Sequence, residues 1–414
     1  MGADILSYGE AYACVAAEAR KLQRRAHRVE SVVLAGAAGR ILAAQLASDR
    51  DQPPFARSTR DGFAVRASEL MSKGPLPVVG SVRAGEAATG PLPRGAAWEI
   101  MTGAPVPVGA DAVVMLEHVE QRAGLIRLLA GRKLERGANV VARGAQARAG
   151  KPLLKPGVRI DAAQIALAAS CGAAELMVYA KPRIAILTTG DELVAVNAEP
   201  GPAQIRNSNA PMLETLVAQA GGTPLPASTV ADTASALDAA LARALDADLL
   251  VISGGVSAGK FDLVEPALAR LGAKFRFTGV RMQPGKPLAF GAIPRAGTGP
   301  LPFLGLPGNP ISSAVTFLLF GAPLVQALSG AAEYGPRFAA ARLAEATDRR
   351  ANPALTRFLP AHCAPGSDAL PAVTPVPWHG SGDLAAFARA NAFLVVPEGT
   401  ATLKAGATVR VLVL

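Results

Sequence analysis

The sequence predicts a multidomain protein that combines an α/β domain, built on a largely parallel sheet, with β-rich domains and a helical linker region. The first observation is length, because 414 residues, half of them hydrophobic, exceed one compact core and suggest two to four domains. The second is a regular alternation of strand-like and helix-like segments between residues 180 and 330. The third is the short, Gly- and Pro-punctuated β-rich segments on both sides of that region.

The chain opens with a predicted helix. Residues 7–27 carry apolar residues at helical spacing, and positive charge gathers at the end, where it suits the helix dipole. Short β-rich segments then predict a small, mainly β domain over 28–146. A second helix is expected at 161–172, and its apolar face needs a partner, for which the first helix is the expected candidate. The two helices define the predicted linker domain, residues 1–27 with 147–179.

The α/β domain is predicted over 180–330. Alternating units of this length specify a parallel sheet covered by helices on both faces and joined by right-handed crossovers. The last helix holds the longest apolar run, which contains Gly, Pro and Gln and falls short of the roughly 20 residues of a membrane span, so we expect a buried helix. The tail, 331–414, predicts a small β barrel or sandwich. The predicted strands are 183–188, 223–228, 247–253 and 300–306, and the predicted helices are 210–221, 233–245, 262–272 and 311–329.

Composition narrows the classes of partner. The formal net charge of +10 suits nucleic acid, an anionic membrane or a small acidic ligand. The basic residues are scattered, and four Tyr and two Trp supply few stacking platforms, so nucleic acid is the weaker option. Three distant cysteines fit neither a disulfide framework nor a zinc site, and no signal sequence opens the chain. We therefore expect a cytoplasmic protein with no nucleic-acid and no membrane partner.

Three glycine-rich loops follow predicted strands of the α/β domain. They are TTGDE at 188–192, SGGVSAGKFD at 253–262 and LPGNP at 306–310. Open α/β sheets bind ligands outside the carboxyl ends of their strands. Small residues let backbone N–H groups approach an anion, and two of the loops lead directly into a helix, whose amino end favours negative charge. If the three strands are neighbours, we expect an oxyanion or phosphate ligand in one crevice.

Several loop residues also have purely structural interpretations. Asp262 stands three residues before Glu265, so the pair is at least as well explained as a helix capping box. Asn309 followed by Pro310 makes a good N-cap and N1 pair. Lys260 is either a phosphate ligand or, more often, a solvated loop lysine. Taken singly, these loops are weak indications of a site.

Other polar candidates differ in how strongly they indicate function. Glu192 follows Asp191 at the carboxyl edge, and neighbouring carboxylates repel each other unless a cation joins them, which favours function. In the β-rich region, Asp61 belongs to an Asp-Gly pair that is ordinarily a turn, and Thr102 lies in a turn between predicted strands. The four histidines are dispersed without ligand spacing.

Together these segments resemble one family, the molybdopterin molybdenumtransferases, called MoeA in bacteria and represented in animals by the E domain of gephyrin. The resemblance implies a subunit of four parts, with a MogA-like, molybdopterin-binding three-layer α/β domain and a small C-terminal β barrel. It further implies an elongated homodimer with a crevice between the α/β domain of one subunit and the β-rich domain of the other. The matching stretches occur in family order over essentially the whole chain: PPFARSTRDGFAVRA, MTGAPVPVGADAVVM, TTGDEL, IRNSNAPML, SGGVSAGKFD, PGKPLAFG, GLPGNPISSAVTF and GSGDLAAFARANAFLVVPEG.

The resemblance also implies a reaction and its residues. The reaction is the Mg²⁺-dependent insertion of molybdate into adenylylated molybdopterin, which releases AMP, and a molybdopterin adenylyltransferase is the implied upstream donor. Glu192 and Asp262 are implied metal ligands, and Lys286 and Ser257 are implied to contact anionic oxygens. The implied catalytic positions are Asp61 and Thr102 of the partner subunit with Glu192, Asp262 and Lys286. The implied substrate-binding positions are Thr189, Gly190, Asp191, Asn207, Ser208, Asp232, Gly254, Gly255, Ser257, Pro307, Gly308, Asn309, Pro310 and Ser312.

Four positions depart from the family pattern and keep a second hypothesis open. Ala145 and Gln146 stand where an acidic pair is usual, Gln283 stands where lysine often precedes PGKP, and Lys260 stands where an acidic residue is common. A catalytically altered paralogue that binds molybdopterin or acts as a scaffold would also fit these changes. A third hypothesis, an unrelated nucleotide hydrolase, leaves the motifs of the β-rich and C-terminal regions unexplained.

Overall fold

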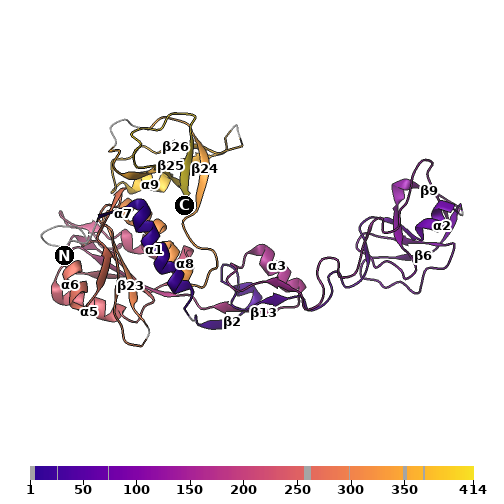
Figure 1. Ribbon diagram of the computed structural model, residues 1–414, viewed down its shortest axis with the longest axis horizontal. Helices are drawn as coiled ribbons and strands as arrows, with labels where there is room; N and C mark the ends of the chain where they lie inside the picture. The colour runs from indigo at the N-terminus through magenta and orange to yellow at the C-terminus, as the bar shows by residue number, and fades with distance from the viewer. Residues whose placement is uncertain are drawn as a thin grey trace. The chain divides into compact units, whose positions relative to one another are not determined.

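The chain divides into two compact units. The larger unit comprises 1–43, 156–161 and 175–414, and the smaller unit comprises 44–155 and 162–174. Figure 1 shows the elements of both units coloured along the chain. The computed structural model describes residues 5–25, 27–72, 74–255, 263–297, 299–347, 352–366 and 369–414.

The larger unit is built on a mixed sheet with a parallel centre. β14 (Arg183–Thr189), β19 (Leu249–Ser253) and β23 (Leu301–Leu306) are consecutive neighbours and run parallel. The predicted strand 223–228 is instead two short strands on the outer side of β14, separated around Pro226, which has no N–H to donate. Beyond β23 the sheet continues antiparallel, an edge that the sequence did not indicate. The outer strands are β17 (Thr223–Pro224), β18 (Ser228–Val230), β22 (Ala289–Ile293) and β20 (Lys274–Phe277).

Helices cover both faces of this sheet and complete three layers. Alternating side chains of the strands point to opposite faces. Ile184 and Val251 join a core with α4, α7 and α8, whereas Leu187 and Ile252 join a core with α5 and α6. The three-layer α/β architecture predicted from the sequence is therefore confirmed. The helices are α4 (Asn209–Gln219), α5 (Ala234–Ala244), α6 (Val264–Arg270), α7 (Pro310–Thr316) and α8 (Ala322–Leu328).

A π-helical turn, Phe317–Gly321, joins α7 to α8 into one continuous helical run. Within the described residues, Pro310–Leu328 is a stretch with the length and composition of a membrane span, but 89% of its apolar window is buried inside the protein. Phe317, Phe320 and Leu324 are fully buried in the core of the larger unit. The prediction of a buried helix here is confirmed.

The first helix, α1 (Tyr8–Gln23), begins in a capping box: the Ser7 side chain accepts from the Glu10 N–H, and the Glu10 carboxylate accepts from the Ser7 N–H. Its buried face, which includes Val15 and Leu22, packs against α8 (Figure 1). The helix predicted at 161–172 is α3 (Ala162–Ser170), which belongs to the smaller unit, and its packing against α1 stays a prediction. An amphipathic stripe shows that a helix needs a partner but not which one.

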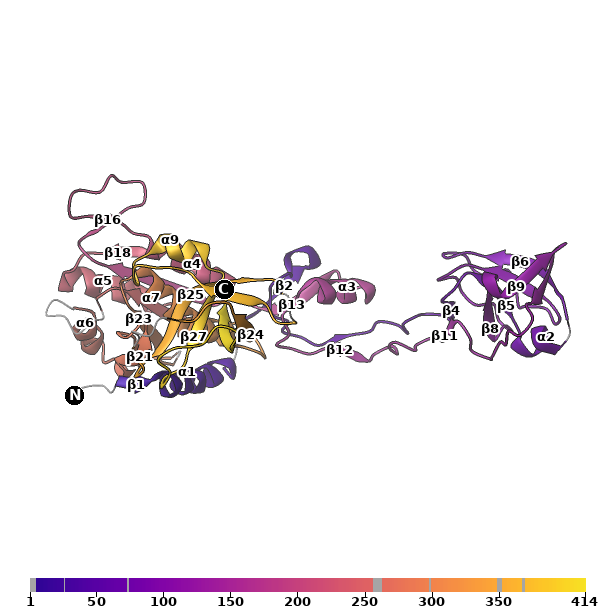
Figure 2. The ribbon, with the colours of Figure 1, turned by 90° about the horizontal axis from the view of Figure 1, so that it is seen from above.

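The C-terminal region forms a closed barrel. Its strands are hydrogen-bonded in the order β25-β26-β24-β28-β27, and β27 returns to β25. Leu343, Val373, Leu394 and Val411 fill the interior. The ring confirms the small β barrel predicted from the sequence, and Figure 2 shows its strands from above. The strands are β24 (Phe338–Leu343), β25 (Thr356–Ala364), β26 (Ala372–Pro375), β27 (Ala392–Val396) and β28 (Thr408–Val413), with helix α9 (Leu384–Arg389) between β26 and β27.

The barrel also continues into the rest of the larger unit through β21 (Gly279–Gln283). This strand pairs in parallel with β1 (Ile5–Ser7) on one side and with β25 on the other. Two further ladders lie in the larger unit: β2 (Val29–Val33) pairs antiparallel with β13 (Glu175–Tyr179), and β15 (Leu193–Val194) pairs parallel with β16 (Ile205–Arg206).

The smaller unit is built mainly of β-strands, as the sequence predicts. Its mixed sheet has the order β8-β5-β7-β6-β10-β9, and Phe63, Trp98 and Val113 are buried at its faces. Its strands are β3 (Leu46–Ala47), β4 (Arg57–Ser58), β5 (Gly62–Val65), β6 (Leu76–Val82), β7 (Ala97–Ile100), β8 (Ala112–Met115), β9 (Val119–Arg122), β10 (Leu125–Leu128), β11 (Val140–Val141) and β12 (Pro152–Leu154), with helices α2 (Ala67–Ser72) and α3.

Candidate functional site

The candidate site lies at the carboxyl edge of the parallel strands. Because β14, β19 and β23 are neighbours, the loops 188–192, 253–255 and 306–310 leave the sheet side by side, as the sequence argument required. The Gly254 N–H donates to the Leu306 carbonyl at 3.1 Å, and a Cβ on Gly308 would lie 3.7 Å from the Gly254 Cα. The predicted site residues Ser257 and Asp262, and the departure at Lys260, lie outside the described residues.

Close backbone contact between two of the loops depends on Gly254. Its φ is +93°, and a Cβ there would lie 2.5 Å from the carbonyl oxygen of Thr189. Gly255 follows with φ +64°. Consecutive left-handed glycines turn the chain sharply after β19, and only glycine adopts this conformation without a steric penalty. The glycines of the SGG turn therefore let the loop after β19 lie directly on the loop after β14.

Asn209 is a site residue that the sequence argument missed. Its side-chain amide nitrogen donates to Ser253 Oγ at 2.9 Å and to the Gly308 carbonyl at 2.6 Å. Ser253 Oγ in turn lies 3.3 Å from Ser313 Oγ. Asn209 thus ties the start of α4 to the loops after β19 and β23. The third residue of the NSN triplet was a usable signal, because an asparagine that opens a helix beside glycine loops can bond to them.

Two buried polar atoms at this edge have no protein partner. Thr189 Oγ1 and Asn209 Oδ1 are enclosed and make no hydrogen bond within the described residues. Buried polar groups nearly always find a partner, so each such atom in a folded protein calls for one. A hydroxyl that can donate and an amide oxygen that can accept are suited to a ligand with both kinds of polar group.

A group of carboxylates lies beside these loops. The Asp232 N–H donates to Asp191 Oδ1 at 2.9 Å, and the Glu192 carboxylate lies within 2.6 Å of the position that a Cβ on Gly190 would take. Burial, then the charge of Asp191 and finally that of Glu192 raise the pKa of Asp232, against a hydrogen bond from the Asp191 backbone that lowers it. None of the three carboxylates has an ion-pair partner among the described residues, and no three acidic, histidine or cysteine side chains of those residues lie close enough together to hold a metal ion by themselves. Carboxylate oxygens are nevertheless the type of ligand that Mg²⁺ prefers, and one or two of them suffice when the rest of its shell is water or phosphate.

Asn207 and Ser208 support the start of α4. Asn207 is 4% exposed, and its amide nitrogen donates to Thr188 Oγ1 at 2.8 Å and to Thr229 Oγ1 at 3.0 Å. Its amide oxygen accepts from the Ala210 N–H at 3.1 Å. The side chain of Asn207 is therefore fully engaged with the protein. Ser208 occupies the N-cap position of α4, and its side chain makes no capping bond.

The LPGNP loop is covered by a turn of the C-terminal region, 379–383, that the sequence argument did not connect to it. Asn309 Nδ2 donates to Ser381 Oγ at 2.9 Å, and the Ile311 N–H donates to the Ser381 carbonyl at 2.9 Å. Asn309 is the N-cap residue of α7 with Pro310 in its first turn, but its side chain makes no capping bond. Ser312, behind the loop, is 4% exposed. The loop is thus held from both sides.

Asp383 fixes the conformation of this covering turn. Its carboxylate accepts from the N–H groups of His379 and Ala386, each at 3.0 Å, so it caps α9 and closes the turn. Those backbone hydrogen bonds, followed by the bond from the His379 ring, lower the pKa of Asp383. The GSGD stretch of the sequence therefore has a structural role at the candidate site.

Lys286 follows the strand β21. Its carbonyl accepts from the Val280 N–H at 2.9 Å, which folds the PGKP turn back on the strand. Gly285, with φ +111°, lies so close to α7 that a Cβ would be 2.5 Å from Thr316 Cγ2. Gln283, one of the departures from the family pattern, is the register partner of Arg357, which is only 4% exposed. A positive charge therefore lies on the strand next to Gln283.

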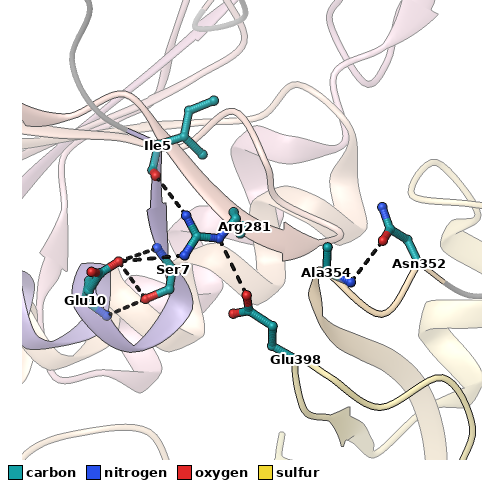
Figure 3. Close-up of polar contacts among 7 residues, drawn as sticks. All are labelled: Ile5, Ser7, Glu10, Arg281, Asn352, Ala354 and Glu398. Carbon is teal, nitrogen blue, oxygen red and sulfur yellow. Dashed lines mark hydrogen bonds and ion pairs between the residues drawn. The ribbon is translucent and has the colours of Figure 1, made fainter.

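The strand that leads to Lys286 is held by a polar junction, shown in Figure 3. The Arg281 guanidinium donates to the Ile5 carbonyl at 3.3 Å. It also lies 3.7 Å from Glu398 of the barrel and 4.0 Å from Glu10 of α1. These contacts are half exposed, so they contribute little free energy, but they join three segments that are distant in the sequence.

The smaller unit brings two further predicted residues together. Asp61 directly precedes β5, Thr102 follows β7, and these strands pair with Gly62 opposite Ile100. The Asp61 carboxylate accepts from the Thr102 N–H at 2.7 Å. The departures Ala145 and Gln146 lie in a turn between β11 and β12 of the same unit. Each cluster thus forms within its own unit.

Comparison with known proteins identifies the family. Three family models match successive parts of the chain: the MoeA N-terminal region (domains I and II) at 6–172, a probable molybdopterin-binding domain at 185–327, and the MoeA C-terminal region (domain IV) at 342–414. A molybdopterin molybdenumtransferase of Nostoc is 36% identical over 92% of this chain and 88% of its own length, and one of Bacillus subtilis is 35% identical over 93% and 90%.

Solved structures agree with this assignment. A molybdopterin biosynthesis MoeA protein from Pyrococcus horikoshii superposes with a TM-score of 0.81 at 25% identity, over 99% of this chain and 100% of that chain. A second structure of a MoeA protein from that source has a TM-score of 0.75 at 30% identity, covering 99% of each chain. The chain therefore belongs to the MoeA family and is a transferase of molybdenum cofactor biosynthesis.

Proposed function

We propose that this protein inserts molybdate into adenylylated molybdopterin in a Mg²⁺-dependent reaction that releases AMP. The observation that carries the proposal is the convergence of three glycine-rich loops beside the carboxylates of Asp191, Glu192 and Asp232. A phosphoanhydride requires N–H donors and cations together, and this edge of the sheet supports the proposal with glycine-rich loops for the first and carboxylate oxygens, the type of ligand that Mg²⁺ prefers, for the second.

Named groups have distinct tasks in this proposal. The backbone N–H groups of Gly255, Gly308 and Asn309, which make no hydrogen bond among the described residues, bind the phosphate oxygens. Thr189 Oγ1 and Asn209 Oδ1, which are buried without partners among the described residues, orient the polar end of the ligand. Lys286 provides a further positive charge for anionic oxygens. Ser257, in the SGGVSAGKFD stretch, is assigned to the same oxygens from the sequence. Glu192 and Asp262 are the metal ligands that we propose, with Asp191 and Asp232 nearby.

A bound Mg²⁺ would neutralise charge that develops on the phosphate oxygens as AMP leaves. The protein's own contribution is to position these oxygens and to place carboxylates beside them. Burial, and then the charges of Asp191 and Glu192, raise the pKa of Asp232. Positive charge at this position would lower that pKa again, which is the physical reason to expect coupled binding of metal and phosphate.

The proposal includes a homodimer in the cytoplasm. Asp61 and Thr102, joined by their 2.7 Å hydrogen bond in the smaller unit, would act at the reacting end of the ligand held by the partner subunit's α/β domain. The molybdenumtransferase names of the relatives support the overall reaction. The substrate would be supplied by an adenylyltransferase that acts on molybdopterin.

AMP release from adenylylated molybdopterin, measured with and without molybdate and Mg²⁺, tests the proposal. Release should require both, and Glu192→Gln and Asp262→Ala should abolish it. Glu199→Gln is the matched control, because Glu199 is an exposed carboxylate on the segment between β15 and β16 and should be dispensable. Release without molybdate would contradict the proposed reaction. Binding of the substrate without turnover in the wild type would support the paralogue hypothesis instead.

A further inference from the structure

A second cavity lies in the larger unit, away from the carboxyl-edge loops. It has a volume of about 590 Å³ and is bordered by Lys181, which precedes β14, and by Gly221, which precedes β17. It is therefore at the amino edge of the parallel strands. The connection from α8 to the barrel, residues 329–337, forms one wall. A volume of this size lies within the range of about 300–1,000 Å³ that is usual for small-molecule sites.

The walls of the cavity are firmly held. The Ala332 N–H donates to the Gly157 carbonyl at 2.9 Å, and the Gly335 N–H donates to Gln326 Oε1 at 2.9 Å. Gly330 lies under the Tyr179 ring, where a Cβ would be 2.4 Å from a ring atom. The cavity is thus pre-formed, so a ligand would not need to order the connection when it binds.

Arg40 is one of the charged groups that line the cavity. Its side chain is only 11% exposed, and Nη2 contacts both the Tyr179 carbonyl, at 2.9 Å, and the Glu30 carboxylate. The N–H groups of Nε and Nη1 have no acceptor among the described residues. A largely buried guanidinium with free donors is suited to bind an oxyanion through charge-assisted hydrogen bonds.

Two further cations in the lining lack counter-ions. Lys181 and Arg337 make no ion pair or side-chain hydrogen bond in the part of the chain that the structure describes. Arg159 is already balanced by Asp161 at 3.6 Å, and Glu333 is the remaining acid of the lining. The unpaired positive charges therefore favour the binding of an anion, and a concave surface strengthens the electrostatic field of these charges.

The nearby helix ends weaken this field only slightly. α4 and α8 both end at the cavity, where free carbonyl groups would carry partial negative charge. In both helices these carbonyls are capped: the Gly222 N–H donates to Val217 at 3.0 Å, and the Ala331 N–H donates to Gln326 at 3.2 Å. Left-handed glycines at the ends complete the caps. The side-chain cations thus dominate the electrostatics.

Aromatic rings supply the rest of the lining. Tyr12, Tyr179 and Tyr334 border the cavity and are half-buried. The Tyr12 ring is stacked on the Tyr8 ring, with centroids 6.1 Å apart, and the centroids of the Tyr179 and His27 rings are 5.1 Å apart. Rings that are held in place by other rings offer ordered surfaces on which a flat ligand can stack.

From this arrangement we propose that the amino-edge cavity is a second ligand site, separate from the candidate active site, for a small phosphate ester that carries a flat ring. The phosphate group contacts Arg40, Lys181 and Arg337, and the ring lies against the tyrosines. A dianionic phosphate suits two unpaired cations beside a guanidinium with free donors better than a monoanionic carboxylate does.

Calorimetric titration of the full-length protein with phenyl phosphate and with inorganic phosphate, at an ionic strength near 0.15 M that screens diffuse surface attraction, tests the proposal. The Lys181→Gln/Arg337→Gln double variant should bind phenyl phosphate at least about tenfold more weakly. The matched control, Lys404→Gln/Arg127→Gln, removes the same charges elsewhere and should bind like the wild type. Tyr334→Ala should weaken phenyl phosphate but not inorganic phosphate.

Hydrogen exchange locates the bound ligand. Phenyl phosphate should protect amides in 38–41 and 329–337, and Thr189→Val at the other edge should leave this protection intact. Unchanged affinity in the Lys181/Arg337 variant, an equal loss in the control, or protection confined to the carboxyl-edge loops would overturn the proposal. Equal affinities for phenyl phosphate and inorganic phosphate would overturn the assignment of a ring-bearing ligand. Molybdate-dependent AMP release should be unchanged in the double variant, which separates this test from that of the proposed function.

Discussion

Replacing Gly254 by alanine should separate the loop after β19 from the loop after β14. The new Cβ would lie 2.5 Å from the Thr189 carbonyl oxygen, a backbone atom that cannot rotate away, and 3.0 Å from Thr189 Oγ1. A left-handed φ costs an L-residue about 1–2 kcal/mol, and an extra methyl group in a packed site costs about 1–3 kcal/mol. The local free energy of unfolding should therefore fall by about 2–5 kcal/mol.

Gly308→Ala is the matched control on the neighbouring loop. Gly308 is outside the left-handed region, and its new Cβ would meet only the Gly254 Cα at 3.7 Å, an ordinary van der Waals distance. Stability should change by less than about 0.5 kcal/mol. Because the methyl group would enter the proposed phosphate cradle, AMP release should still fall. The two variants thus separate damage to the fold from damage to the ligand surface.

Hydrogen exchange of the β14 and β19 amides is the appropriate measurement. A protein with several domains does not unfold in a single transition, so a global midpoint would not report the free energy of this region. Exchange should accelerate in Gly254→Ala and stay unchanged in Gly308→Ala. Equal exchange in wild type and Gly254→Ala, or equal acceleration in both variants, would refute the reasoning from close backbone contact.

Three further outcomes are expected. Asp232→Asn should slow amide exchange around β18 at neutral pH, because burial and neighbouring carboxylates raise the pKa of Asp232, so its charged form weakens the folded state. The difference in exchange between variant and wild type should vanish as the pH falls through the raised pKa, and a difference that is constant with pH would contradict this. Asp61→Ala should speed exchange at the Thr102 amide, whereas Asp61→Asn, which keeps an acceptor, should not; equal exchange in both would disprove the role of the hydrogen bond. Asp383→Ala should speed exchange of the His379 amide, because it removes the carboxylate that accepts from that N–H. The wild type should show the same faster exchange as the pH falls through the lowered pKa of Asp383, and a pH series of amide exchange would detect or exclude this.

The elements that the sequence predicted are those with a local signal. The apolar runs of β14, β19 and β23 and the amphipathic patterns of α4 and α5 are local, and each is found close to its predicted range. The antiparallel edge strands were missed because they are short and acquire their conformation from neighbouring strands. The packing of α1 against α8 was not predicted for a related reason, since periodicity carries no information about the opposing surface.

The candidate site likewise combines features that have a local signal in the sequence with features that depend on distant contacts. Glycine-rich loops at strand ends are visible in the sequence, and the expectation that their strands are neighbours is confirmed. Asn209 and Ser381 were missed because their hydrogen bonds join segments from distant parts of the chain. Asn207, which the resemblance implied as a substrate contact, has its amide used by Thr188, Thr229 and Ala210. A residue type at a motif position does not reveal which of its atoms remain free.

The position of β21 has a consequence for when the protein becomes functional during synthesis. β21 is flanked by β1, with Ile5 opposite Gly279, and by β25, with Gln283 opposite Arg357. The first strand of the chain therefore waits for its partner until most of the polypeptide has left the ribosome, whereas domains that lie within one segment can fold as they emerge. The strand that precedes Lys286 gains its second neighbour only when β25 is made. Nascent chains that stop before residue 356 should contain a folded α/β core with one edge of β21 unpaired, and such an edge is a template for association with other chains.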